Sequence, residues 1–406
     1  MDSLTQIALG AAVGEAVLGK KVGNRAMLWG AIGGTIPDLD IIANLFTDEI
    51  TALAFHRGIS HSFLFAVLAP LALGWAADQL YKSGLYRKKG YKLFVMIGGI
   101  SFYSLLALGI NVIPVLAGGE ASLGMISGSV LLGLGLVIWI WKSYYEPDSA
   151  VVEASWRDWA WLLFWAIFTH PLLDCCTAYG TQVFQPFSDY RVAFNNISVV
   201  DPIYTLPLVL ALVIAARLFR HHVWRRRLNY LGLALSTAYL LFGFYNKSKV
   251  NQVFEVTLAE RQIDYHRYTT SPTIFNNVLW NCLAEGDTAY YYGHYSLNDR
   301  EPKVAILNVF PKNHELIAEH EAEYNIQTLK WFTNNYYSII RNEEGNLQLN
   351  DLRFGLFGDE VTSSKDYVFR FILEEKDGKL TARQVRGADR SIGEVFSQLW
   401  ERIKGI

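Results

Sequence analysis

Long apolar segments in the first 246 residues constrain the fold of this chain more than any other feature. Six of them are long enough for an α-helix to cross about 30 Å of hydrocarbon. Two earlier segments are weaker, because they are rich in Gly and Ala and contain acidic residues. We therefore predict a polytopic all-α membrane domain of about six to eight helices. The strong segments are 62–80, 93–117, 122–142, 158–176, 202–219 and 229–246, and the weak ones are 3–19 and 26–45.

Charged residues are spread unevenly along the chain. Residues 1–246 hold 17 basic and 15 acidic side chains, about 13% of that stretch, whereas residues 247–406 hold 19 and 23, about 26%. Soluble domains have about a quarter of their residues charged. The chain is therefore divided into a membrane domain, 1–246, and a soluble domain, 247–406. The net charge of −2 gives no reason to expect a nucleic-acid partner.

The soluble domain has the pattern of an α+β fold. Apolar and polar residues alternate over several short stretches, as expected for strands. One pair of stretches is joined by Asp377-Gly378, a favoured hairpin turn, and Ser391 with Glu394 forms a capping box before a helix. The predicted strands are 253–258, 289–295, 303–310, 367–373 and 380–385, and the predicted helices are 312–333 and 391–404.

Basic loops predict the orientation in the membrane. The loops 81–92 and 217–227 are rich in Lys and Arg, which favours the cytoplasmic side. Four predicted crossings separate them, an even number, so the two assignments agree. The loops 46–61 and 177–201 and the whole soluble domain then lie outside. We therefore expect a multi-pass protein of the inner (plasma) membrane with an extracytoplasmic C-terminal domain.

Acidic and imidazole side chains gather at the predicted outer ends of the membrane segments. Such residues are costly near hydrocarbon and are usually functional. Pro37 favours a turn around the first two carboxylates, and the last pair shares one helix face because it is spaced i, i+4. Together these side chains predict a divalent-metal site. The predicted ligands are Asp38, Asp40, His56, His61, His170 and Asp174.

Imidazole and carboxylate ligands together fit zinc, manganese or iron better than magnesium. A metal at this site would lower the pKa of a bound water and polarise a phosphoryl or carbonyl oxygen. Arg57 and Asp38 are the candidate catalytic residues. For Arg57, a role as a clamp for a phosphate or carboxylate of the substrate and a role as a contact to lipid head groups fit equally well. Ser60 and Ser62 are predicted helix caps. Each motif taken alone also fits a turn, a cap or a hydrogen-bonded pair.

Four motifs resemble the YdjM/YbcI-type (DUF457-like) membrane-bound metal-dependent hydrolase family. They are the opening Met1-Asp2-Ser3-Leu4-Thr5-Gln6, Pro37-Asp38-Leu39-Asp40, His56-Arg57-Gly58-Ile59-Ser60-His61-Ser62 and His170-Pro171-Leu172-Leu173-Asp174. The resemblance covers about residues 1–246 and implies hydrolase activity. The family is distantly similar to zinc-dependent phospholipase C and single-strand nucleases, whose His-x-x-x-Asp element maps onto His170 and Asp174. Gln6 stands where the family often has His, so one metal position is expected to be weakened.

The predicted function is metal-dependent hydrolysis of a phosphoester such as a lipid head group, with the lipid bilayer as the other partner. A lipid is favoured because the site lies at head-group depth. The sequence lacks a Gly-x-Ser-x-Gly elbow and a Walker loop, which argues against a serine hydrolase and an NTPase. The alternative is a non-catalytic metal-binding scaffold or a metal carrier. Metal carriers usually bind their ion near the bilayer midplane, whereas the predicted ligands lie at one membrane edge. Of these two alternatives, the scaffold is therefore favoured.

Overall fold

The computed structural model describes residues 1–405 apart from 117–121, 146–151, 359–360, 377 and 386–391. The described residues form two compact units. One combines Met1–Pro70 with Trp161–Ile406, and the other is Leu71–Ala160. All the predicted metal ligands belong to the first unit.

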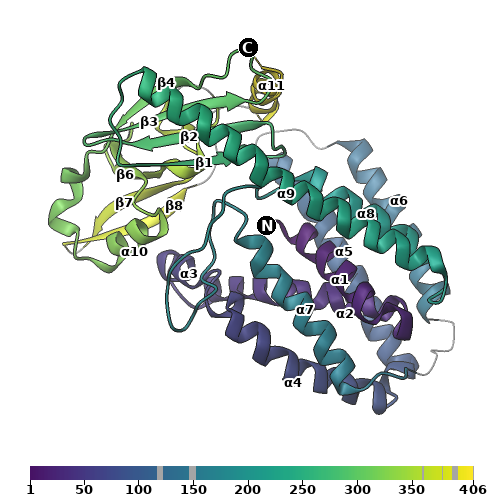
Figure 1. The fold of residues 1–406 in the computed structure, drawn as a ribbon. Coiled ribbons are helices and arrows are strands. Elements are labelled where there is room, and N and C mark those ends of the chain that lie inside the picture. Colours follow the sequence, from purple (N-terminus) through teal and green to yellow (C-terminus); the bar gives the residue numbers. More distant parts are fainter. Residues whose placement is uncertain (117–121, 146–151, 359–360, 377, 386–391, 406) are drawn as a thin grey trace. The chain divides into compact units, whose positions relative to one another are not determined.

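The first 260 residues are mainly helical (Figure 1). Among the described residues, four helices are long and apolar enough to cross a membrane: α4, the Lys89–Gly109 part of α5, α6 and α9. The predicted mostly helical N-terminal region is confirmed, with four candidate spans, while crossings by α1, α2, α7 and the shorter α8 stay predictions. The helices are α1 (Ser3–Val22), α2 (Asn24–Thr35), α3 (Glu49–Phe55), α4 (Phe63–Lys82), α5 (Lys89–Leu116), α6 (Leu123–Ile140), α7 (Trp156–Asp174), α8 (Pro202–Arg217) and α9 (Val223–Glu260).

Glycines allow α1 and α2 to pack with their backbones in contact. A Cβ atom at Gly10 would lie 2.3 Å from the carbonyl oxygen of Gly30, and one at Gly34 would lie 2.5 Å from the carbonyl oxygen of Gln6. Both distances are too short for any side chain, so only glycine permits this approach. The packing holds the end of α2 against the start of α1.

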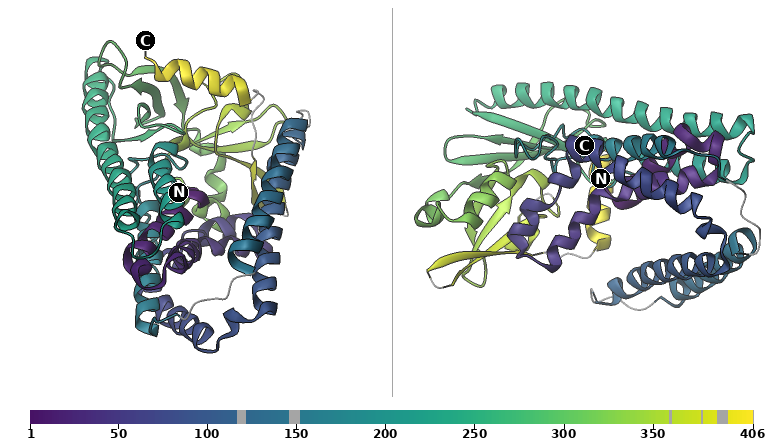
Figure 2. Two further views of the ribbon diagram at one scale, coloured as in Figure 1. Left: turned by 90° about the vertical axis from the view of Figure 1, so that its right-hand side faces the viewer. Right: turned by 90° about the horizontal axis from the view of Figure 1, so that it is seen from below.

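The predicted strand 253–258 is wrong, because these residues continue α9 to Glu260. The sequence alternates there, but the fully buried Val250, Phe254 and Leu258 are spaced four residues apart, as on one helix face. They pack with Trp280 of the sheet beside them. The predicted domain boundary at Lys247 therefore falls inside an unbroken helix (Figures 1 and 2).

Two antiparallel four-stranded sheets follow, which confirms the helical-then-α+β order. The strands of each sheet pair in chain order. The predicted strands 289–295 and 303–310 and the hairpin 367–385 are confirmed, with Asp377 outside the described residues. The first sheet contains β1 (Arg267–Pro272), β2 (Leu279–Glu285), β3 (Ala289–Ser296) and β4 (Ala305–Pro311), and the second contains β5 (Tyr337–Arg341), β6 (Leu347–Asp351), β7 (Arg370–Lys376) and β8 (Lys379–Val385).

The predicted helix 312–333 is wrong in its continuity. It is divided into a 3-10 segment, His314–His320, and the helix α10 (Tyr324–Phe332). The predicted helix 391–404 is confirmed as α11 (Ile392–Ile403), while its proposed cap Ser391 lies outside the described residues.

The short helix α3 joins the core of the second sheet although it precedes that sheet by almost 300 residues. Ile50 is fully buried among Ile326, Leu329 and Phe371, and the Glu49 carboxylate accepts a hydrogen bond from the backbone of Gln384 at 2.9 Å. The loop that follows α3 carries His56 and His61. This loop is therefore fastened to the C-terminal domain.

Candidate metal centre

The predicted ligands reach the site from three places in the chain, the last of which is the end of α7 with His170 and Asp174. Asp38 and Asp40 lie in a 3-10 segment, Pro37–Leu45, which Pro37 opens because it has no N–H to donate to α2. His61 closes a second 3-10 turn, Ile59–His61, just before α4. The next residue, Ser62, accepts a hydrogen bond from the backbone of Phe65 at 3.0 Å, which confirms its predicted capping role.

Four of the six predicted ligands meet in one buried cluster, Asp38, His61, His170 and Asp174, whose ligand atoms lie within 4.8 Å of one another. His61 Nε2 lies 3.1 Å from His170 Nε2. It lies 3.6 Å from Asp38 Oδ1 and 3.5 Å from Asp174 Oδ2. His170 Nε2 lies 3.4 Å from each of the same two oxygens. We call these four residues the Asp–His cluster.

These separations match the spacing of ligands around one small ion. Zinc binds nitrogen and oxygen ligands at about 2.0–2.1 Å in tetrahedral sites, which places neighbouring ligand atoms about 3.3 Å apart. The five measured separations, 3.1 to 3.6 Å, lie around that value. The Asp–His cluster could therefore hold a metal ion.

Both imidazoles are turned so that their Nε2 atoms face the cluster. His170 Nδ1 donates to the carbonyl oxygen of Gly34 at 2.6 Å, because a carbonyl can only accept. His61 Nδ1 faces Ser60 Oγ at 3.0 Å and Asp40 Oδ2 at 3.4 Å. Burial lowers the pKa of His61 to about 4, so its ring is neutral near pH 7. Such outer partners are the usual means of orienting metal-binding histidines.

Some buried polar atoms at the cluster lack a hydrogen-bond partner within the described part of the chain. They are Asp174 Oδ2, Gln6 Oε1 and Arg57 Nε. Arg57 Nε lies 3.2 Å from Asp174 Oδ2, but the two are not aligned for a hydrogen bond. The other oxygen of Asp174 accepts hydrogen bonds from Gln6 Nε2 at 3.0 Å and from the nitrogen of Met1. Unpaired buried groups are costly, and a bound ion or ligand is a common reason for them.

Asp40 and His56 form a separate group beside the cluster. The Asp40 carboxylate accepts hydrogen bonds from His56 Nδ1 and from the backbone N–H of Arg57, each at 2.8 Å, and from Ser60 Oγ at 3.3 Å. A 3-10 segment has three residues per turn, so residues two apart point to different sides of it. Asp38 and Asp40 therefore face different groups. Direct metal binding by Asp40 and His56 stays a prediction.

Arg57 is held in an unusual backbone conformation next to the cluster. Its φ of 57° lies in the left-handed region, which costs free energy for a non-glycine residue. Its Nη1 donates to Thr177 Oγ1 at 3.1 Å, and its guanidinium lies 4.6 Å above the ring of Tyr179. Strain of this kind is concentrated at functional sites.

Tyr179 and Thr177 were not among the residues predicted from the sequence. Tyr179 packs edge-on against His56 and also contacts Phe332 and Phe354 of the C-terminal domain. No motif marks these residues, although they follow Asp174 closely in the chain. The carbonyl of Gly34, which orients His170, was equally hidden because every residue has one.

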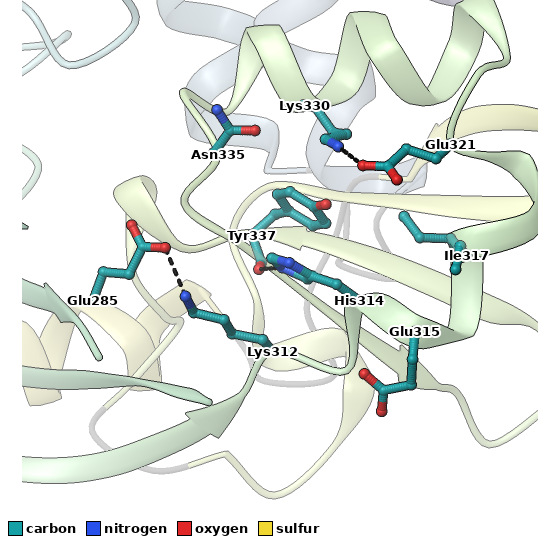
Figure 3. A pocket seen from close by; sticks show the side chains of 10 residues that line it. Glu285, Lys312, His314, Glu315, Ile317, Glu321, Lys330, Asn335 and Tyr337 are labelled. Carbon is teal, nitrogen blue, oxygen red and sulfur yellow. Dashed lines mark hydrogen bonds and ion pairs between the residues drawn. The ribbon is translucent and has the colours of Figure 1, made fainter. Parts of the chain in front are cut away.

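A separate cavity of about 380 Å³ lies in the C-terminal domain (Figure 3). Its two lysines are already neutralised: Lys312 pairs with Glu285 at 2.7 Å, and Lys330 pairs with Glu321. His314 stacks on Tyr337 and hydrogen-bonds to its carbonyl oxygen. Both lysines and His314 thus have partners within the protein, unlike Asp174 Oδ2 of the Asp–His cluster.

The family described as YdjM inner membrane protein matches residues 1–113 and 122–250, more than half of the chain. The matched residues include the whole Asp–His cluster and Arg57. No curated protein and no solved structure matches the chain.

Proposed function

Because the chain belongs to the YdjM inner membrane protein family, we propose that its Asp–His cluster serves a membrane-bound metal-dependent hydrolase that acts on a phosphoester such as a lipid head group. One observation carries the proposal. Two imidazole nitrogens and two carboxylates share the spacing of a single ion, and they lie beside the buried Arg57, whose Nε is 3.2 Å from Asp174 Oδ2 but makes no aligned hydrogen bond within the described residues.

Zinc is the ion that the donor set favours, with manganese or iron as alternatives. The cluster offers two nitrogen and two oxygen donors, a mixture that suits these metals better than magnesium. A bound ion would supply an activated water near neutral pH and would polarise a phosphoryl oxygen. The hydrogen bond of His170 Nδ1 to Gly34 leaves its Nε2 as the atom that faces the ion, and the neutral ring of His61 can offer a lone pair near pH 7.

The chain's own residues suggest where a substrate would approach. The side chain of Asp38 is 22% exposed, whereas those of His61, His170 and Asp174 are fully buried. A substrate therefore reaches the cluster on the Asp38 side. Arg57 would orient a phosphoryl oxygen through its guanidinium, which Thr177 and the ring of Tyr179 hold in place.

A lipid head group suits the expected position of the site. The positive-inside pattern places the ends of α2 and α7 that carry the cluster on the outer side of an inner membrane, with the C-terminal domain also outside. The Asp–His cluster would then lie at head-group depth. This orientation is part of the proposal, and a reporter fused after Ile406 that reads as cytoplasmic would contradict it.

Metal content tests the site directly. We expect the purified wild-type protein to contain close to one equivalent of zinc, manganese or iron by elemental analysis, and His170→Ala and Asp38→Ala to contain less than a tenth of that. His266→Ala is the matched control, because His266 is an exposed histidine paired with exposed Asp287. Equal metal content in all four proteins would rule out the site.

Turnover tests the hydrolase proposal separately. The protein would be reconstituted into vesicles that contain phosphatidic acid or phosphatidylglycerol, and release of phosphate or head group would be measured with and without a chelator. We expect release that the chelator and Arg57→Lys both reduce, since lysine cannot offer the two N–H groups of a guanidinium fork. Metal binding without turnover of either lipid or of bis-p-nitrophenyl phosphate would contradict catalysis.

A structural metal site is the second candidate, and the burial of the cluster favours it. Structural zinc sites are closed and use four protein ligands, and the cluster has four donors, three of them fully buried. In that case the ion would fasten α7 to the segments that carry Asp38 and His61. Metal removal would then lower the melting temperature, and no phosphoester would be hydrolysed.

A further inference from the structure

The last helix, α11, has an aromatic face that is exposed in the chain. Phe396 is 43% exposed and Trp400 is 61% exposed. They lie four residues apart and therefore on the same side of the helix. Glu394 and Glu401 lie on the opposite, polar side. A helix with one strongly apolar and one charged face is typical of the surface of a membrane or of a protein interface.

The orientation of α11 is fixed by contacts near its end. Arg402 forms two hydrogen bonds with the Asp299 carboxylate, at 2.6 and 2.7 Å. Ser296 Oγ at the end of β3 donates to the carbonyl oxygen of Ile403 at 2.9 Å. Near the start of the helix, the ring of Phe396 stacks on Phe275, with centroids 5.4 Å apart. The aromatic face is therefore held in a defined direction.

Phe275 links this face to the outer level of the membrane helices. The backbone N–H of Phe275 donates to the carbonyl oxygen of Val200 at 3.0 Å. Val200 is followed by Asp201, which caps the start of α8. In the same segment, Asn277 accepts a hydrogen bond from Asn246 of α9 at 3.0 Å.

Asn246 marks the point at which α9 leaves its apolar stretch. The closely spaced exposed apolar side chains of α9 end at Tyr245, and lysines follow at 247 and 249. Segment 273–277 is thus tied to the two helices at the level where both pass from apolar to polar surroundings. Ile274 of this segment is also 46% exposed.

Because segment 273–277 holds α11 at this level, we infer that α11 is an interfacial helix. Phe396 and Trp400 would insert among the head groups of the same bilayer that α9 crosses. Aromatic side chains favour this zone because they combine an apolar body with a polar or polarisable edge. Lys404, whose Nζ lies 5.9 Å from the Trp400 ring and pairs with the Glu401 carboxylate at 2.7 Å, follows on the polar border of this face. The C-terminal domain would then have a second attachment to the membrane besides α9. This inference does not depend on the proposed hydrolase activity.

Spin labels on adjacent residues test the inference. A nitroxide would be attached to Trp400→Cys and, as a matched control, to Glu401→Cys, in the full chain reconstituted singly into lipid nanodiscs. The natural cysteines, Cys175, Cys176 and Cys282, are buried, so labelling is confined to the new site. We expect the label at 400 to be relaxed by oxygen and protected from a water-soluble nickel chelate, and the label at 401 to show the reverse.

Two results would overturn the inference. Equal access of the nickel chelate to both labels would place the aromatic face in water. Protection of the label at 400 from both reagents would place it against protein, such as another part of the chain. Phe396→Cys supplies a second label on the same face, so a folding defect specific to the Trp400 variant would not decide the outcome.

Discussion

Helix α1 touches two buried charged groups, one near each end, and they differ in how completely their polar atoms are paired. Near its start, Gln6 contacts the Asp–His cluster. Near its end, Glu15 forms a buried ion pair with Arg225 of α9, with Nε–Oε1 and Nη2–Oε2 distances of 2.6 and 2.5 Å. The first group retains unpaired atoms, and the second does not.

The Glu15–Arg225 pair is complete without any ligand. Besides the two bonds to Glu15, the guanidinium donates to Asn24 Oδ1 at 2.7 Å and to the carbonyl oxygens of Ala215 and Leu218 at 3.2 and 2.9 Å. By contrast, Asp174 Oδ2 has no hydrogen-bond donor among the described residues. Burial of charge alone therefore does not mark a functional site. Incomplete pairing is the feature that separates the two groups.

The largest expected effect is on stability at the Glu15–Arg225 pair. Arg225→Ala leaves a carboxylate buried without its partner, which costs about 3–5 kcal/mol. We expect a lower melting temperature at unchanged metal content per folded protein. Replacing both partners, Glu15→Leu with Arg225→Met, should recover most of the loss, because no unpaired charge is left. Loss of metal in Arg225→Ala would contradict the division between the two groups.

Metal removal should act on the Asp–His cluster alone. At a metal concentration 100 times the dissociation constant, binding stabilises the folded state by about 2.7 kcal/mol. A chelator should therefore lower the melting temperature of the wild-type protein and of the Glu15→Leu/Arg225→Met double variant equally, as measured by thermal unfolding in detergent. Asp38→Asn should show no response. A response in Asp38→Asn equal to that of the wild type would exclude this carboxylate as a ligand.

Asp40 tests how far the support of the cluster extends. Because it faces His61 Nδ1 and holds the backbone of Arg57, Asp40→Asn should weaken metal affinity by about 10–100-fold, the range for outer partners of metal ligands. Titration with a competing zinc indicator measures this. His56→Ala removes a second partner of Asp40 and should cost less. If Asp40→Asn abolishes binding altogether, Asp40 is itself a ligand, as the sequence predicted.

The smallest effect concerns His314 in the C-terminal domain. Burial lowers the pKa of this imidazole from its usual 6.5, so the folded state favours the neutral ring. Its contribution to stability is present above pH 6.5 and is lost as the pH falls toward the lowered pKa. The wild type should lose stability relative to His314→Gln below pH 6.5, by about 1 kcal/mol or less. No change in metal content is expected, because the Tyr337 carbonyl already pairs with this ring.

The residues that the sequence identified share a local signature. His170 and Asp174 face the same side because helical spacing alone dictates it, and the structure places their side chains 3.4 Å apart. The Gly- and Ala-rich composition of α1 and α2 could likewise be seen in the sequence. The strand assigned to 253–258 failed because alternation over six residues also fits a helix whose buried residues are four apart.

The side-chain contacts that join distant segments could not be predicted from the sequence. Asp38 rather than Asp40 faces His170 because of the direction each takes in a 3-10 segment, and the two aspartates are equivalent in the sequence. Arg225 was assigned to a basic loop for its charge, although its side chain is buried against Glu15. Ile50 lies in a membrane-domain loop yet completes the core of the second sheet.

The sequence by itself determined the apolar helices, the change to a strand-rich C-terminal region and the residue types of a metal site, because hydropathy, periodicity and ligand chemistry are properties of neighbouring residues. Only the tertiary structure decided which four side chains meet, which polar atoms stay unpaired and which charged residue is already satisfied. Those outcomes depend on distances of a few ångströms between segments up to 210 positions apart, and no local pattern encodes them.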